Sequence, residues 1–257
     1  MASRLNGVVL LVVVAVLWEF ASRLGLAHPV FFPPATTILA TFADMVRSGE
    51  IPWQVLVSLR RAAVGYALAA AIFIPTGVAM ALFRPVHRLL EVVIELLRPV
   101  PPPALVPVAI VFFGLEDGMK VFVIFLACAW PILLNTVDGV RSIDRVLLNT
   151  ASTFHLGRWA TITKIVIPAA VPQILTGLRI SLGVTLILVV FSEMVGSADG
   201  IGYVVLAAQR AFQVPEMYAG MLALALVGWG LNALFVISTR RLVAWHDRPS
   251  AREDTGG

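Results

Sequence analysis

The chain has 257 residues, of which 59% are hydrophobic and 13% are charged, and its mean hydropathy is +0.92. Soluble domains are about 45–50% apolar and about 25% charged, so this composition excludes an ordinary water-soluble globular protein. The formal net charge is only +4, and the one cysteine, Cys128, indicates neither a disulfide framework nor a metal cluster.

Long apolar segments recur along the whole chain and are separated by short polar connections. A bilayer core of about 30 Å needs about 20 apolar residues per helical span, and alternating strands typical of a membrane barrel do not occur. The sequence therefore predicts an all-α membrane protein with six transmembrane helices. The predicted spans are Gly7–Leu24, Arg61–Phe83, Leu89–Phe113, Val121–Val137, Ile165–Val190 and Met217–Ser238.

The first span lacks a preceding cluster of positive charge and a following Ala-x-Ala site, so we interpret it as retained and not as a cleaved signal. Lys and Arg in short loops then predict the orientation, because these residues accumulate on the cytoplasmic side. With both termini inside, the inner set is Arg4, Arg84, Arg88, Arg141, Arg145, Arg158, Lys164, Arg240, Arg241, Arg248 and Arg252. The smaller outer set is Arg23, Arg47, Arg60, Arg61, Lys120 and Arg210.

After the first span, Pro33 and Pro34 precede the segment Ala35–Arg47, which is predicted to lie outside. Its apolar residues recur at the helical period, which predicts a short amphipathic helix at the membrane interface, with anchoring as its simplest role. The apolar positions are Ile38, Leu39, Phe42, Met45 and Val46.

The third predicted span contains the proline-rich stretch RPVPPPALVP. Each proline removes a backbone donor, and in lipid such a break survives only beside protein or water. We therefore expect this span to be buried, or to line a pathway. Arg98 beside the break is either a pathway residue or a charge that reaches the interface. The candidate pathway or gate residues here are Arg98, Pro99, Pro101, Pro102 and Pro103.

The longest polar stretch between inner helix ends follows the fourth span. Within it, Leu147, Ala151 and Phe154 fall at helical spacing, so the loop is predicted to form a short helix with one apolar face. Such a face is suited either to docking into a groove of a partner or to lying on the membrane surface. Near the outer end of the fifth span, Glu193 is a functional candidate or simply a hydrated acid.

The sequence lacks the motifs of several kinds of functional site. No phosphate-binding G-x-x-x-x-G-K-[ST] loop is present, and no His/Cys cluster suggests a metal site. All four histidines (His28, His87, His155 and His246) lie outside the predicted spans, which argues against a membrane-embedded enzyme. An ion-coupled secondary carrier is a further alternative, but the proline break has no counterpart in span six.

The stretch LLNTASTFHLGRWATITKIVIPAAVP, beginning at Leu147, resembles the cytoplasmic EAA loop of ABC-importer permeases, with the pattern Glu-Ala-Ala…Gly…Ile-x-Leu-Pro. The closing residues align with Ile165, Ile167 and Pro168. The Glu-Ala-Ala positions then fall on Asn149, Thr150 and Ala151, and the glycine position falls on His155. The Glu and the Gly are therefore absent, and the missing Gly puts the expected backbone turn in question.

Four further stretches resemble the nitrate, aliphatic-sulfonate and taurine branch of these permeases. They are SLRRAAVGYALAAAIFIPTGVAMAL, LRPVPPPALVPVAIVFFG, WPILLNTVDGVRSIDR and SEMVGSADGIGYVV, in the family's order. The resemblance implies a type I ABC importer permease fold for a small anionic solute. It divides the chain into an N-terminal helix with an external segment (1–57), a permease core (58–245) with a cytoplasmic loop at about 141–164, and a disordered cytoplasmic tail (246–257).

The resemblance also implies the partners. They are a cytoplasmic ATPase dimer that holds ATP and Mg, a second permease copy forming a homodimer, and an external or lipid-anchored substrate-binding protein. The chain itself would bind no cofactor and would reside in a bacterial inner membrane. The part around Asn149–Trp159 would be the coupling helix, and Glu193 joins the proline stretch as a pathway or gate candidate. The whole ATPase-coupling loop would comprise Leu147, Asn149, Thr150, Ala151, Phe154, His155, Gly157, Arg158, Ile165, Ile167 and Pro168.

Overall fold

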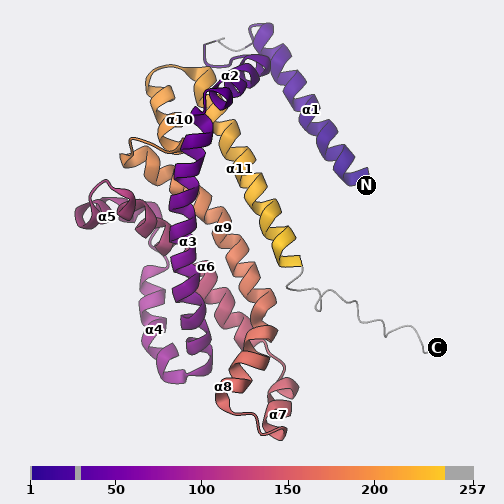
Figure 1. The fold of residues 1–257 in the computed structure, drawn as a ribbon, viewed down its shortest axis with the longest axis vertical. Helices are drawn as coiled ribbons and strands as arrows, with labels where there is room; N and C mark the ends of the chain where they lie inside the picture. Colours follow the sequence, from indigo (N-terminus) through magenta and orange to yellow (C-terminus); the bar gives the residue numbers. More distant parts are fainter. Residues whose placement is uncertain (1, 27–29, 241–257) are drawn as a thin grey trace, which may run out of the picture. The chain divides into compact units, whose positions relative to one another are not determined.

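The computed structural model describes residues 2–26 and 30–240, and within these ranges all regular secondary structure is helical (Figure 1). The predicted all-α class is confirmed for the described residues. In chain order the elements are α1 (Ala2–Arg23), α2 (Ala35–Arg47), α3 (Glu50–Leu82), α4 (Arg84–Leu97), the 3-10 turn η1 (Pro102–Leu105), α5 (Val106–Phe113), α6 (Asp117–Arg141), α7 (Arg145–Thr153), α8 (Arg158–Thr161), the π-helical segment η2 (Ile162–Val166), α9 (Ile167–Gly196), α10 (Ile201–Arg210) and α11 (Val214–Arg240).

Four of the described helices are long and apolar enough to cross a membrane. They are α3, α6, α11 and the continuous run Arg158–Gly196 that contains α8, η2 and α9. A fifth candidate exists only if α4 and the segment η1–α5 are counted together as one span. The structure therefore supports a multi-pass membrane protein, and the count of six spans stays a prediction.

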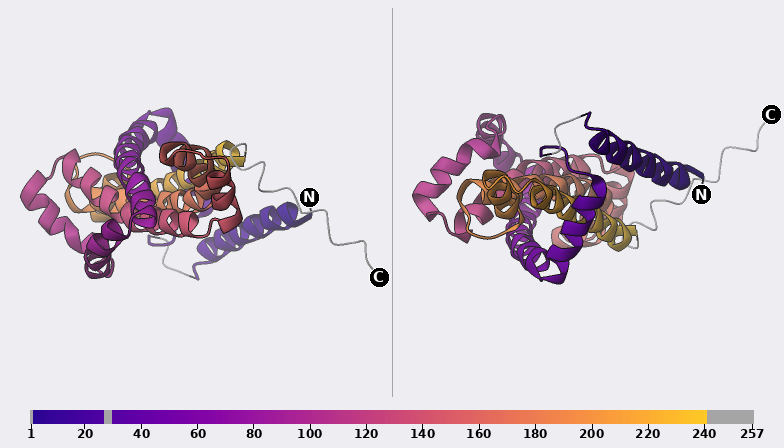
Figure 2. Two further views of the ribbon diagram at one scale, coloured as in Figure 1. Left: turned by 90° about the horizontal axis from the view of Figure 1, so that it is seen from below. Right: turned by 90° about the horizontal axis from the view of Figure 1, so that it is seen from above.

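The predicted third span, Leu89–Phe113, is wrong as a single helix. The chain bends by 89° between Arg84–Leu97 and Pro102–Phe113, and Figure 2 shows from two directions that α5 turns away from the line of α4. Pro101 has extended backbone angles and precedes two further prolines that begin η1. Because proline donates no backbone hydrogen bond, the helical hydrogen bonds of α4 cannot continue through this stretch.

The described residues fall into two compact units. The first comprises Met1–Arg61 and Val189–Val227, and its apolar core includes Met45, Ile51, Ile201, Val204, Ala219 and Ala223. The predicted amphipathic helix Ala35–Arg47 is present as α2, and Phe42 and Met45 on its apolar face pack in this core. Trp18 fixes α1 to the segment before α2, because its Nε1 donates to the Pro33 carbonyl at 2.9 Å and its ring stacks on Phe32.

The second unit comprises Ala62–Leu188 and Gly228–Gly257. Its helices α3 and α6 approach closely where glycines of α3 face side chains of α6. A Cβ atom on Gly65 of α3 would lie 2.7 Å from Ile124 of α6, and one on Gly77 would lie 2.8 Å from Thr136. Glycine at these positions therefore permits the tight helix contact that is typical of membrane bundles. Apolar clusters among its described residues include Met80, Ile94, Leu133 and Val137 in one, and Val140, Val166, Ala170 and Ile174 in another. The predicted tail 246–257 lies outside the described residues.

Candidate functional site

The polar loop of the second unit contains α7, a nine-residue helix. Its N-cap is Asp144, whose side chain accepts a hydrogen bond from the backbone N–H of Val146 at 2.8 Å. This is the ordinary role of an aspartate at a helix start. Asn149 lies inside the helix and does not cap it, while its carbonyl accepts hydrogen bonds from Ser152 and Thr153. The loop is thus ordered by its own polar residues.

The C-terminal end of α7 turns at His155, which has a left-handed φ of 53°. The N–H of His155 donates to the Ser152 carbonyl at 3.0 Å, and the N–H of Leu156 donates to the Ala151 carbonyl at 3.0 Å. This pair of bonds is a Schellman motif, in which glycine is the usual residue at the left-handed position. The backbone turn expected for a glycine is therefore present, although a histidine occupies it.

After this turn, α8 leads through η2 into α9. In η2 the backbone hydrogen bonds span five residues instead of the four of an α-helix, and the N–H of Ile167 donates to the Ile162 carbonyl. Pro168 follows directly and has no N–H to offer the Lys164 carbonyl, which an α-helix would require. The proline that ends the loop motif thus coincides with an irregular helical segment where the chain enters its next apolar span.

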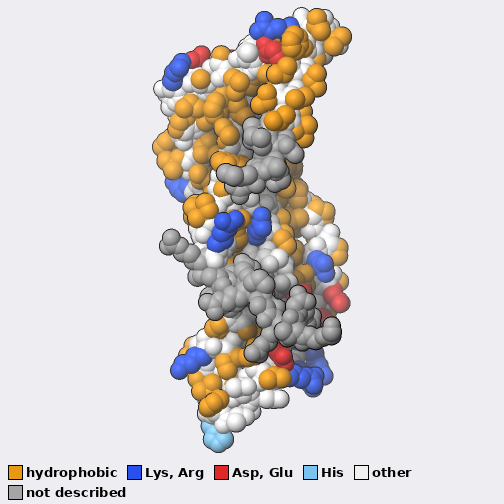
Figure 3. All heavy atoms as spheres, turned by 90° about the vertical axis from the view of Figure 1, so that its right-hand side faces the viewer, with side chains coloured by type: hydrophobic (Ala, Val, Ile, Leu, Met, Phe, Trp, Pro, Cys, Tyr) orange, Lys and Arg blue, Asp and Glu red, His pale blue; other side chains and the backbone are white. Residues whose placement is uncertain are grey.

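The loop exposes large apolar side chains beside basic ones. Phe154 is 74% exposed and Trp159 is 76% exposed, whereas Ala151 is 2% exposed and packs inside the unit. The predicted apolar face is therefore only partly presented to the outside. Figure 3 shows hydrophobic and basic side chains together on the end of the molecule where α7 and α8 lie in Figure 1. The exposed members include Val146, Leu147, Leu148, Phe154 and Trp159, with Arg145 and Arg158 among them.

The candidate pathway residues around the proline break lie at the connection between α4 and α5. Arg98 is the exposed C-cap of α4, and its N–H donates to the Ile94 carbonyl at 2.8 Å. Pro99 and Pro101 are exposed, while Pro102 and Pro103 are partly buried in η1. These five residues belong to the second unit, whereas Glu193 belongs to the first.

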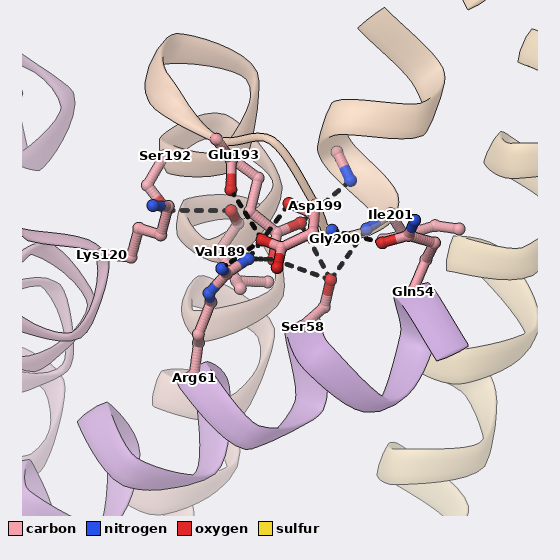
Figure 4. Close-up of polar contacts among 12 residues, drawn as sticks. Gln54, Ser58, Arg61, Lys120, Val189, Ser192, Glu193, Asp199, Gly200 and Ile201 are labelled. Carbon is pink, nitrogen blue, oxygen red and sulfur yellow. Dashed lines mark hydrogen bonds and ion pairs between the residues drawn. The ribbon is translucent and has the colours of Figure 1, made fainter. Parts of the chain in front are cut away.

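Glu193 is at the centre of a buried polar cluster in the first unit (Figure 4). Its side chain has no exposed surface, which excludes the interpretation of a simply hydrated acid. Arg61 donates from Nη1 to Oε1 of Glu193 at 3.0 Å and from Nη2 to Oδ1 of Asp199 at 2.5 Å. Ser58 donates to the Glu193 carboxylate at 2.8 Å and accepts from the N–H of Ile201 at 2.9 Å. Buried charges are stable only when paired and hydrogen-bonded in this way.

Two glycines complete the cluster. The N–H of Gly202 donates to Oε2 of Glu193 at 3.0 Å, and the N–H of Gly200 donates to Oε1 of Gln54 at 2.6 Å. A Cβ atom on Gly200 would lie 2.2 Å from Cδ of Glu193. The cluster therefore joins α3, the end of α9 and the start of α10 in the first unit, and it requires glycine at the turn.

Sequence reasoning missed two residues. Arg61 was assigned to the outer set of loop charges, but it is only 4% exposed and is paired with two carboxylates. Arg179 was not singled out, although it is the one charged residue between Lys164 and Glu193, a signal that the sequence does contain. Among the described residues, no group of three or more His, Cys, Asp or Glu side chains could hold a metal ion.

The family model of the binding-protein-dependent transport system inner membrane component matches residues 71–246, which is more than half of the chain. The chain belongs to this family. Its members are transport subunits, so the chain is a multi-pass inner-membrane permease of an ATP-binding-cassette importer and not an enzyme. Such an importer works with an ATPase and a substrate-binding protein.

Named relatives support the assignment. The chain is 30% identical over 243 residues to the putative aliphatic sulfonates transport permease protein SsuC of Bacillus subtilis (strain 168), covering 95% of this chain and 88% of that one. It is 32% identical over 241 residues to the taurine transport system permease protein TauC of Escherichia coli (strain K12), covering 92% and 88%. It is also 32% identical over 242 residues to the bicarbonate transport system permease protein CmpB of Synechococcus elongatus, covering 91% and 84%.

The fold of the permease is also found in a solved structure. An inward-facing structure of the MetNI methionine ABC transporter matches with a TM-score of 0.60 over 74% of this chain and 93% of that chain. The sequence identity is only 17%, so this likeness concerns the fold alone. The permease therefore has the fold of type I ABC importers.

Proposed function

We propose that this permease forms the translocation pathway for a small anionic solute, such as a sulfonate, taurine, nitrate or bicarbonate. The proposal is supported by the names of the relatives, which specify sulfonates, taurine and bicarbonate. Sulfonate, nitrate and bicarbonate are all compact oxyanions, in which a negative charge is shared among oxygen atoms. An external binding protein delivers the solute, and the permease supplies the passage through the bilayer.

The proposed assembly contains two copies of the permease and two cytoplasmic ATPase subunits. ATP and Mg are held by the ATPase subunits, because the permease has no phosphate-binding loop of its own. Both termini lie in the cytoplasm in this proposal, since the inner set of loop Lys and Arg residues outnumbers the outer set. The same orientation places the loop with α7 and α8 on the ATPase side.

The observation that carries the coupling proposal is the exposed apolar tip of that loop. Phe154 and Trp159 are each about three-quarters exposed, at 74% and 76%, although both are large aromatic residues. Aromatic side chains of this kind are frequent energetic centres of protein interfaces. Arg145 and Arg158 are also exposed in this loop, and together with the aromatic residues they fit a groove on the ATPase that is apolar with an acidic rim.

Phe154→Asp tests this contact. We expect the variant to insert into membranes normally but to bind the ATPase at least about tenfold more weakly, because the charge replaces an aromatic anchor. The measurement is the amount of ATPase that co-purifies with the tagged permease, together with solute-dependent ATP hydrolysis in proteoliposomes containing the binding protein.

Ser152→Asp is the matched control. Ser152 is exposed in the same turn, and its position two residues earlier places it about 200° around the helix from Phe154. It adds the same charge on another side of α7, so ATPase binding should be nearly unchanged. Ala151 is unsuitable as a test site because a larger residue there would disturb the packing of the loop itself. Normal ATPase binding by Phe154→Asp would contradict the proposed contact.

A further inference from the structure

Arg179 lies in the middle of the longest apolar span of the permease. It is 15 residues after Lys164 and 14 residues before Glu193, and the residues between those two charges are otherwise uncharged. At 1.5 Å per residue, about 20 Å of helix separates Arg179 from either charge. A side chain at this depth is too far from both membrane surfaces to place its charge in the aqueous phase by extending along the helix.

The Arg179 side chain is exposed on the surface of the second unit. Its Nε donates to Oδ1 of Asn232 on α11 at 3.4 Å, and no ion pair to a carboxylate accompanies this contact among the described residues. A guanidinium has five N–H donors, so one contact with an amide leaves most of its hydrogen-bonding capacity available. An uncompensated charge in this position is unstable against lipid.

The surroundings of Arg179 are polar in a way that is unusual for a membrane span. Gln173 and Thr176 are exposed on the same helix within an arc of about 120° from Arg179. Nε2 of Gln173 donates to Oδ1 of Asn135 on α6 at 3.3 Å. Three helices of the second unit, α6, α9 and α11, thus contribute amide, hydroxyl and guanidinium groups to one region of its surface.

We infer that this surface, formed by Asn135, Gln173, Thr176, Arg179 and Asn232, lines the water-filled solute pathway, and that Arg179 contacts an anionic oxygen of the solute near the middle of the membrane. The inference rests on the proposed function. A planar guanidinium is suited to this contact because its fork of donors matches the spacing of oxygens in an oxyanion. The binding protein would select the solute, and Arg179 would favour anions over cations during passage.

The charge preference can be tested with thiol reagents that carry opposite charges. The full importer is prepared with Cys128→Ala and Thr176→Cys in the permease, so that the one thiol of this chain lies on the proposed surface beside Arg179. It is treated with an anionic reagent, 2-sulfonatoethyl methanethiosulfonate, and with a cationic one, 2-(trimethylammonium)ethyl methanethiosulfonate. Both are applied with and without ATP, because the pathway opens alternately.

We expect the Thr176→Cys thiol to react with the anionic reagent from the aqueous phase. Adding Arg179→Gln should lower the ratio of anionic to cationic reaction rates by about tenfold, because the nearby positive charge is lost. Arg179→Lys is the matched control, since it keeps the charge, and it should retain the ratio within about threefold. In transport assays with taurine, ethanesulfonate, nitrate and bicarbonate, Arg179→Gln should reduce uptake of the transported anion while ATPase assembly persists.

Two results would overturn the inference. One is a Thr176→Cys thiol that reacts with a neutral membrane-permeant maleimide but with neither charged reagent in any state, which would place this surface against lipid or protein. The other is a rate ratio that Arg179→Gln leaves unchanged. Co-purification of the ATPase is measured in the same preparations. Its absence would instead contradict the proposed function, so the two failures are distinguishable.

Discussion

At the scale of single residues, His155 occupies a helix-ending position that is usually glycine, and its backbone adopts the conformation of that glycine. Its φ of 53° and its place in the Schellman turn are those of a helix-ending glycine. A side chain in the left-handed region costs roughly 1–2 kcal/mol. The contact of His155 Nδ1 with the Ser152 carbonyl at 3.0 Å offsets part of this cost.

His155→Gly should therefore stabilise the turn by about 1 kcal/mol. The expected result is slower proteolytic cleavage of the loop in the detergent-solubilised permease, with the overall fold unchanged. His155→Ala is the control, because it loses the side-chain contact and keeps the left-handed strain, so it should be cleaved at least as fast as the unaltered chain. A glycine variant that is cleaved faster than the unaltered chain would show that the histidine itself orders the turn.

At the scale of elements, most of what the sequence predicted depended on long apolar runs. The spans at α3, α6, α9 and α11 were predictable because a continuous apolar helix is favoured wherever no proline cluster interrupts it. The Leu89–Phe113 span was predicted with a proline break, but the 89° bend at that break was not, because apolarity alone does not tell a crossing helix from a sharply bent pair. The short helix α7 followed from local periodicity, but the burial of Ala151 depends on tertiary packing.

The cluster around Glu193 also depends on tertiary packing, which local sequence patterns do not predict. Its members Arg61 and Glu193 are 132 positions apart in the sequence, and no local pattern specifies that they meet. Gly200 provided a partial signal, since it follows Asp199 in the short polar connection that precedes α10. Its backbone angles, φ 98° and ψ 159°, lie in a region that is essentially restricted to glycine.

Gly200→Ala should consequently destabilise the first unit by at least about 3 kcal/mol. The added Cβ would meet the Glu193 carboxylate at 2.2 Å, in addition to the backbone strain. Gly49→Ala is the matched control, because Gly49 also has a positive φ of 83° but has open space around the position of a Cβ. It should cost only about 1 kcal/mol. The measurement is the midpoint of thermal unfolding in detergent, and equal shifts for the two variants would mean that the carboxylate cluster moves aside freely.

At the scale of the whole molecule, the exposure of Arg179 bears on how many permease copies the importer contains. An arginine at mid-membrane must be screened from lipid, and within the described residues the single chain leaves it exposed. A second copy related by two-fold symmetry would place the same polar surface opposite itself, enclosing water between identical faces. In such a dimer, symmetry would give both copies equivalent forms of the ATPase contact proposed at α7 and α8.

We therefore expect a permease carrying one affinity tag to retrieve a differently tagged copy when both are made equally in the same cell. Random pairing gives two mixed dimers for each dimer with only the captured tag, so the second tag should be retrieved at about half the amount of the first. The purified importer should contain equal numbers of permease and ATPase chains. Mixing membranes that each contain one tagged form, only after solubilisation, controls for exchange and should give no retrieval. If instead the tagged chain retrieved only ATPase together with a different permease, the two polar surfaces would not be identical. The homodimer proposal would then be wrong, while the role of Arg179 would still be testable in the mixed pathway.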